Sequence, residues 1–173
     1  MASKTFNQLA LGTVGSVDLA KSGCGAVAIA DLAYNLDTGI TPEKVAKWLI
    51  LKGYLSSGGT TRTGLTEGLS HFGFDSLYFR DEHKNGKPFK HFFEILKRSE
   101  DLEMWGVALM VGDISTYWTR GGHYVAITSY RYNKDKGRDE YYVRDGANGR
   151  TGWHPLSDFK DAVNVAWIVT KLY

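Results

Sequence analysis

The stretch SGCGAVAIADLAYNL, residues 22–36, decides the fold. From Cys24 onward it is almost wholly apolar and too long for a strand, so we expect a buried helix with its N-cap at Ser22 or Gly23. The only cysteine of the chain then stands in the first turn of a helix, where unpaired backbone N–H groups and the helix dipole favour a thiolate. Gly23 and Gly25 leave room beside it for a substrate backbone. Because a lone cysteine in a core helix is usually inert, a catalytic role needs support from the rest of the chain.

Helices precede strands along the remaining sequence. A second helix is predicted from Thr41-Pro42 to Gly53, since Pro is favoured at the first helical position and Gly after the last. Two more are predicted at residues 64–72 and 89–98. Short segments rich in Val, Ile, Tyr and Trp follow and are typical of strands: Trp105–Val111, His123–Tyr130, Glu140–Arg144 and Val163–Thr170. This order predicts an α+β domain in which N-terminal helices, one carrying Cys24, pack on a C-terminal, mainly antiparallel sheet.

The composition is that of a single globular domain spanning residues 1–173, with 43% hydrophobic and 23% charged residues. A net charge of +2, carried in short mixed runs, argues against nucleic acid as a partner. No window approaches the ~18–20 apolar residues of a membrane span. No secretory signal is visible, which predicts synthesis in the cytoplasm, with release by another route if the substrate lies outside.

His123, in the run GGHYVAITSY, is the expected base. The polar turn NKDKGRD joins its strand to the next in a hairpin centred near residue 135, so opposed residue numbers sum to roughly 270. Position 123 therefore faces roughly position 147, and both Asp145 and Asn148 are admissible partners for the imidazole. A histidine opposite a thiolate needs such a partner to hold its tautomer and to stabilise the imidazolium.

Other residues are weaker candidates for the site. Gln8 is the only glutamine, and its side-chain amide together with the Cys24 backbone N–H would form an oxyanion hole. Gly122 leaves room beside the base, and Trp118 is expected either to wall the substrate cleft or to pack in the core. The loop at residues 58–62, GGTTR, is expected either to close over the site or to be an ordinary connector.

Together these residues resemble the C39-like peptidases of bacteria and phages, within the papain-like superfamily. The resemblance covers roughly residues 6–160 and rests on FNQ, SGCGAVAIADLAYNL, GITPEKVAKWLILKGY, GGHYVAITSY and YYVRDGANG. It implies a papain-like fold in which Cys24 is the nucleophile, His123 the base, Asp145 the orienting acid and Gln8 the oxyanion donor. Two departures stand out: the family usually has Pro where this chain has Ala26, and often has Pro after the acid, where this chain has Gly146.

The resemblance leaves the substrate open. A chain without transporter segments looks more like a phage endolysin or another peptidoglycan peptidase acting on stem peptides. The alternative within the family is a leader or protein-processing peptidase. Outside it stand a CHAP- or NlpC-like amidase, a transglutaminase-like acyltransferase, and a non-catalytic binding module with an unreactive Cys24. The other histidines have no metal-ligand spacing with the cysteine, so neither a metal nor a cofactor is predicted.

Overall fold

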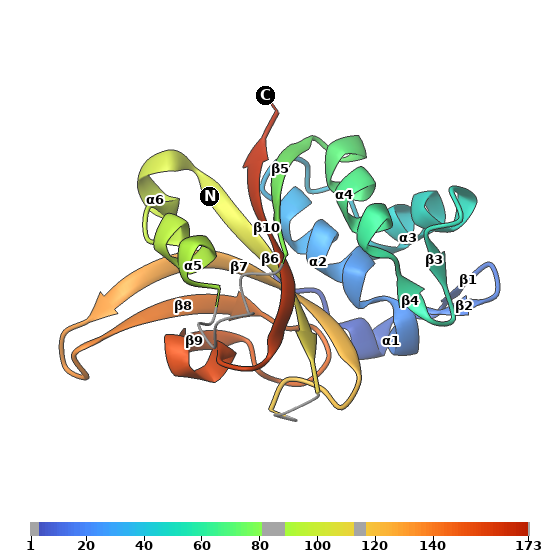
Figure 1. The fold of residues 1–173 in the computed structure, drawn as a ribbon. Helices are drawn as coiled ribbons and strands as arrows, with labels where there is room; N and C mark the ends of the chain where they lie inside the picture. The colour runs from blue at the N-terminus through green and yellow to red at the C-terminus, as the bar shows by residue number, and fades with distance from the viewer. Residues whose placement is uncertain (1–3, 81–88, 113–116, 173) are drawn as a thin grey trace.

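A six-stranded antiparallel sheet forms the centre of the computed structural model, as far as residues 4–80, 89–112 and 117–172 describe it (Figure 1). Its strands run in the order β5-β10-β6-β7-β8-β9, with bounds Phe74–Phe79, Val163–Lys171, Met104–Val111, Gly122–Asn133, Arg138–Arg144 and Gly152–Pro155. One face carries α1 to α4, with bounds Leu19–Ser22, Cys24–Ala33, Pro42–Leu51 and Arg62–His71. The other face carries α5 and α6, Lys90–Leu96 and Ser99–Leu102. The expected α+β fold, with N-terminal helices on an antiparallel sheet, is confirmed.

Side-chain caps fix where the helices begin. At α3 the Thr41 hydroxyl accepts a hydrogen bond from the Lys44 N–H at 3.3 Å, and Pro42 occupies the first helical position as predicted. At α4 the Thr61 hydroxyl accepts from the Gly64 N–H at 2.9 Å, which starts the helix two residues before the predicted position. The helix α2 ends at Ala33, so the three residues expected to prolong it form tighter turns instead.

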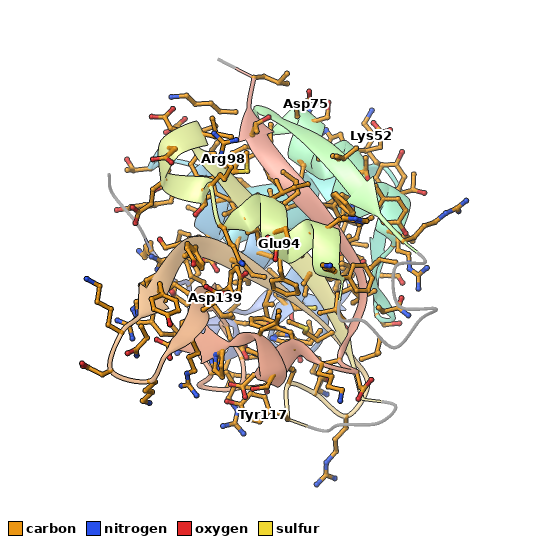
Figure 2. The ribbon with its side chains drawn as sticks, turned by 60° about the vertical axis from the view of Figure 1, so that its left-hand side comes forward. Lys52, Asp75, Glu94, Arg98, Tyr117 and Asp139 are labelled. Atoms are coloured by element: carbon orange, nitrogen blue, oxygen red, sulfur yellow. The ribbon has the colours of Figure 1, made fainter. Side chains whose placement is uncertain are left out.

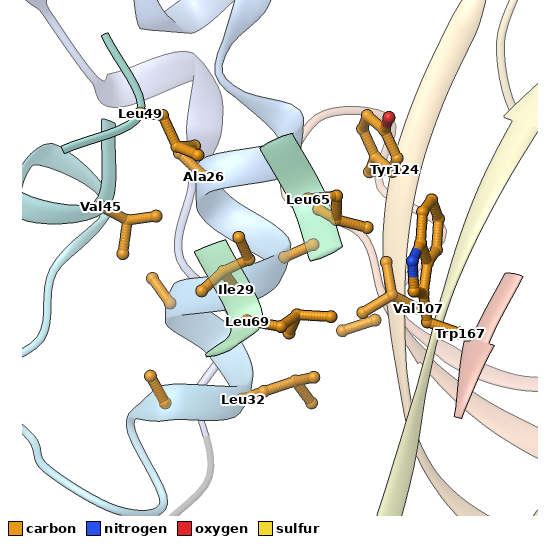
Figure 3. Packing of buried hydrophobic residues seen from close by; sticks show 14 of the residues in the cluster. Ala26, Ile29, Leu32, Val45, Leu49, Leu65, Leu69, Val107, Tyr124 and Trp167 are labelled. Atoms are coloured by element: carbon orange, nitrogen blue, oxygen red, sulfur yellow. The ribbon is translucent and has the colours of Figure 1, made fainter. Parts of the chain in front are cut away.

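The helices α2, α3 and α4 bury their apolar faces against one side of the sheet (Figure 3). Ile29 and Leu32 of α2, Leu65 of α4, and Val107 and Trp167 of the sheet all belong to this cluster and are fully or almost fully buried. Burying one such aliphatic side chain stabilises a fold by about 1.5–3 kcal/mol. The helix that carries Cys24 is therefore held rigidly on the sheet.

A second apolar cluster lies under α5, on the opposite side of the sheet. Figure 2 looks toward this side, where Lys97, the residue that follows α5, forms ion pairs with Glu94 at 3.2 Å and with Asp139 of β8 at 3.1 Å. Beneath them the Tyr141 hydroxyl donates to the Phe93 carbonyl at 3.0 Å. The sheet is thus covered on both faces, and its strands are buried between two cores.

The hairpin of β7 and β8 has the predicted register. Ala126 pairs with Arg144 and Ile127 with Val143, so each pair of numbers sums to 270. A register shift follows between Ile127 and Ser129. The register brings the start of β7, with the histidine, to the end of β8, where the acid follows.

Short elements escaped sequence prediction. The edge strands β5 and β9 were not expected, nor were the two-stranded hairpins β1–β2 (Thr13–Val14, Val17–Asp18) and β3–β4 (Leu55–Ser56, Gly59–Thr60). The helices α1 and α6 and the 3₁₀ turns at Gln8–Ala10 and Leu156–Phe159 were also missed. These elements are too short, and alternate too little between apolar and polar residues, to give a periodic hydrophobic pattern in the sequence.

Candidate active site

Cys24 is the first residue of α2, and its side chain is partly exposed. Gly23 caps the helix and lies buried: its N–H donates to the Leu19 carbonyl at 2.9 Å, and a Cβ there would come within 2.6 Å of that oxygen. Glycine is therefore required for the tight turn from α1 into α2. Gly23 is not among the residues that line the cleft beside Cys24, and its expected contact with substrate stays a prediction. Gly25 is needed because a Cβ would lie 2.6 Å from the Thr60 hydroxyl, so β4 packs directly on the start of α2.

His123 and Asp145 form a buried pair at the mouth of the sheet. The His123 Nε2 lies 2.7 Å from the Asp145 Oδ1, and the two side chains are only 6% and 0% exposed. The other ring nitrogen, Nδ1, takes no part in this contact, and the Cys24 side chain lies near enough to the imidazole to raise its pKa. Thiol, imidazole and carboxylate thus follow one another in space, although they come from α2, β7 and the loop after β8.

The loop that carries the acid is built around its carboxylate. Besides His123, the Asp145 Oδ1 accepts the backbone N–H groups of Ala147 at 3.0 Å and Asn148 at 3.1 Å. The Asn148 side chain turns away and donates its amide to the Trp118 carbonyl. Of the two partners left open by the sequence, Asp145 is the one that contacts the imidazole.

The pKa values of His123 and Asp145 are shifted in opposite directions. Burial by itself lowers the pKa of His123, but the hydrogen bonds to Asp145 and Cys24 outweigh burial and raise that pKa to about 9. Burial by itself raises the pKa of Asp145, whereas the hydrogen bond and the charge of His123, with the two backbone N–H donors, hold it below its usual range. The imidazole is therefore protonated, and the carboxylate ionised, at neutral pH.

Gly146, the position where the family often has Pro, is explained by the N-terminal segment. A Cβ on Gly146 would come within 2.5 Å of the Phe6 carbonyl oxygen, and the Gly146 carbonyl accepts the Gln8 N–H at 2.9 Å. The N-terminal segment crosses the acid loop so closely that only glycine fits. Ala26, the other departure, is fully buried in the core behind the nucleophile.

Gln8 is buried, with 3% exposure, rather than a surface residue. Its side-chain nitrogen donates to the carbonyls of Leu19 at 3.2 Å and Ala20 at 3.3 Å, which lie on the short helix before the nucleophile. Both bonds are long for an amide donor. Donation to an oxyanion would require one of them to be released.

A cleft of about 350 Å³ opens beside Cys24. One wall is the loop at residues 58–62, and the other comprises Leu109 of β6 with Gly122 and Tyr124 of β7. Gly122, expected to leave room beside His123, lines the same cleft as Cys24, and its contact with substrate stays a prediction. The loop that was expected either to close over the site or to act as a connector forms a wall of the cleft.

Trp118 packs in the core, one of the two positions expected for it, and is not among the residues that line this cleft, so its assignment to substrate binding is not supported. Its indole is 1% exposed, stacks on Phe159 with ring centroids 5.4 Å apart, and donates its N–H to the Asp158 carbonyl at 2.8 Å. It belongs to the second core, under the opposite face of the sheet. Only its backbone serves the site, through the carbonyl that holds Asn148.

Sequence reasoning missed Asp31, which is 1% exposed on α2. Its Oδ1 accepts the Phe6 N–H at 2.8 Å and so ties the N-terminal segment to the nucleophile helix. A lone carboxylate within an apolar helix was the available signal. Among the described residues, no cluster of His, Cys, Asp or Glu is arranged to hold a metal ion. None of the helices described is long and apolar enough to cross a membrane.

The sequence alone matches no family model and no curated protein. The structure is similar to the peptidase domain of Streptococcus ComA, a bifunctional ABC transporter of a quorum-sensing pathway (TM-score 0.59, 14% identity, 86% of this chain and 91% of that one). It is also similar to a double-glycine motif protease from an AMS/PCAT transporter, solved with its leader peptide (TM-score 0.55, 16% identity, 86% and 84%). A third similar structure is the N-terminal C39-like peptidase domain of a toxin secretion ATP-binding protein from Vibrio parahaemolyticus (TM-score 0.51, 16% identity, 87% and 98%).

The chain thus has the fold of the C39 peptidase domains, a papain-like cysteine peptidase fold. At these identities the likeness establishes the fold alone. What the chain does has to be argued from its own site.

Proposed function

We propose that this chain is a cysteine peptidase with Cys24 as nucleophile, His123 as acid and base, and Asp145 as the residue that orients the imidazole. The observation that carries the proposal is the 2.7 Å contact between His123 and Asp145, with the cysteine at the start of α2 near enough to the imidazole to raise its pKa. A histidine with a purely structural role needs only one polar partner, such as the carboxylate. A histidine held between a carboxylate and a helix-start thiol has the arrangement of a nucleophilic triad.

The reaction follows from this arrangement. The Cys24 thiolate attacks the carbonyl carbon of the scissile amide, and the negative charge moves to the carbonyl oxygen. That oxygen is held by the Cys24 backbone N–H, with the Gln8 amide as the candidate second donor. The His123 imidazolium protonates the leaving amine, and the C–N bond breaks to leave a thioester. The neutral imidazole then takes a proton from water, which hydrolyses the thioester and restores the thiolate and imidazolium.

For the substrate we propose a peptide segment of a protein, cleaved in a processing reaction. The C39 structures named above include one solved with a leader peptide. The glycines that border the cleft, Gly58, Gly59 and Gly122, offer backbone surface and little side-chain bulk to an extended peptide. The peptidoglycan peptidase expected from the sequence has no counterpart among these structures, so we place protein processing ahead of it.

Two measurements test the proposal. Iodoacetamide should alkylate Cys24 of the native protein much faster than the same residue in the unfolded chain, and His123→Ala should abolish this difference. A library of internally quenched peptides with small residues at the centre should be cleaved by wild type and not by Cys24→Ala. The alternative substrate is tested by incubating purified bacterial sacculi with the protein and identifying the released fragments by mass spectrometry. Release of stem-peptide fragments without cleavage of any library peptide would overturn the processing function and restore the cell-wall function.

A further inference from the structure

The cleft beside Cys24 contains one charged lining residue, Arg62. Every other residue that lines it is a glycine or carries a neutral side chain, apart from the thiol itself. Among the described residues, the cleft lining thus includes no carboxylate to compensate the guanidinium. A positive charge at the edge of a peptide-binding cleft selects for negative charge in whatever binds there.

Arg62 is anchored but not neutralised. It is the first residue of α4, and its Nη2 donates to the Asn164 Oδ1 on β10. Asparagine is a neutral acceptor, so the contact fixes the guanidinium without cancelling its charge. Within the part of the chain that the structure describes, Arg62 forms no ion pair with a carboxylate. Because a guanidinium carries five N–H donors in a fork, several remain available to a ligand.

The guanidinium acts within the cleft rather than away from it. Tyr124 lines the same cleft, and its hydroxyl donates to the Thr60 carbonyl, two residues before Arg62, at 3.0 Å. Burial and the nearby Cys24 raise the pKa of Tyr124, while the charge of Arg62 opposes them. The pKa of Tyr124 therefore depends on both Cys24 and Arg62, which places both residues near it in the cleft.

We infer that Arg62 forms an anion-selective subsite, and that the peptide cleaved at Cys24 carries a carboxylate, from Asp, Glu or a chain end, in the residues beside the scissile bond. Arginine suits this role because its planar fork binds a carboxylate through two parallel N–H bonds. The inference rests on the proposed peptidase function and adds an acidic substrate segment to it.

The competing explanation is structural, because Arg62 also ties the start of α4 to β10 through Asn164. Two variants separate the roles. Arg62→Gln removes the charge, and Asn164→Ala removes the tie but keeps the charge. Arg98→Gln is the matched control, since Arg98 is an exposed arginine beside α6, on the face of the sheet away from the cleft (Figure 2).

The first experiment needs no substrate. The rate at which Cys24 reacts with anionic iodoacetate, divided by its rate with neutral iodoacetamide, reports the charge felt at the thiol. At low salt Arg62→Gln should lower this ratio about two- to five-fold, the size expected for one charge acting across a partly hydrated cleft. The iodoacetamide rate should stay within about two-fold of wild type. Asn164→Ala and Arg98→Gln should leave the ratio unchanged.

The second experiment uses internally quenched peptides that differ only by Glu, Gln or Lys at each position flanking the cleaved bond. Wild type should favour Glu at one position or more, Arg62→Gln should lose that preference, and Arg62→Glu should favour Lys there. If wild type alkylates and cleaves, but the ratio and the preference do not respond to Arg62, the acidic subsite is refuted and the peptidase stands. An equal loss of both alkylation rates in Arg62→Gln and Asn164→Ala would make Arg62 a structural tie and refute the subsite as well. A Cys24 that reacts no faster than in the unfolded chain would remove the peptidase and, with it, this inference.

Discussion

Replacing Asp145 by Asn removes the charge that faces His123 and keeps the shape of the side chain. The contact is short, 2.7 Å, and buried, and a hydrogen bond to a charged group contributes about 1.5–3 kcal/mol. Since ~1.4 kcal/mol corresponds to one pKa unit, the pKa of His123 should fall by about one to two units from its value of about 9. Among the described residues the Asp145 Oδ2 has no hydrogen-bond partner, so an amide nitrogen at that position finds no acceptor there and does not compensate for the lost bond.

The protonation of the histidine rings can be followed by NMR, with the resonance assigned by comparison with His123→Ala. At pH 8 the wild-type ring should be roughly nine-tenths protonated and the Asp145→Asn ring about half or less. Asp158→Asn is the matched control, because Asp158 holds another buried histidine, His154, at 2.9 Å. It should leave the His123 titration in place. A wild-type ring that titrates near 6.5, or one that Asp145→Asn does not move, would refute the electrostatic argument.

The remaining predictions concern single residues. Cys24→Ala should abolish peptide cleavage while the melting temperature changes little, since alanine suits a helix start; residual turnover above a few per cent would exclude this nucleophile. Gln8→Ala should lower kcat about 10²–10³-fold and leave Cys24 alkylation near the wild-type rate, because alkylation builds no oxyanion; a parallel fall of both rates would show that Gln8 braces the helix start. For Asp31, burial raises the pKa to about 8, while the Phe6 N–H and the charge of Arg144 oppose it. The unfolded chain loses this proton near pH 3.8, so the stabilisation from the buried acid is complete below that pH and is lost as the pH rises through about 8. Asp31→Asn should therefore flatten the pH dependence measured by urea unfolding and raise the unfolding free energy at pH 8 by about 2 kcal/mol or more; parallel curves for the two proteins would contradict this.

The parts of the structure that the sequence predicted are those with a local signal. The apolar run after Cys24 and the Thr-Pro start of α3 define helices by periodicity and capping, which need no tertiary context. The His123–Asp145 contact was within reach because one turn sets the register of a hairpin, and the observed pairs sum to the expected number.

The parts that it missed depend on contacts between distant segments. Trp118 is polar at one edge and apolar elsewhere, so its position before the histidine fits a cleft wall or a core equally, and only the packing of Phe159 decides for the core. The sequence also did not show that Gly23 is required for the tight turn from α1 into α2, where a Cβ would meet the carbonyl of Leu19. Arg62 lies at the cleft because β4 folds onto α2, an approach that no periodicity reveals.

The path of the N-terminal segment has a consequence for the growing polypeptide. Residues at its start bond to partners synthesised near the end: Thr5 accepts from Arg144, which is 139 positions later, and the Gln8 N–H meets the Gly146 carbonyl. Contacts so distant in sequence form late in folding, and a chain emerges from the ribosome N-terminus first. A growing chain that has not reached His123 therefore carries the Cys24 thiol without either of the two residues proposed to assist it. The proposed activity can arise only after the segment around Gln8 has met the residues around Gly146.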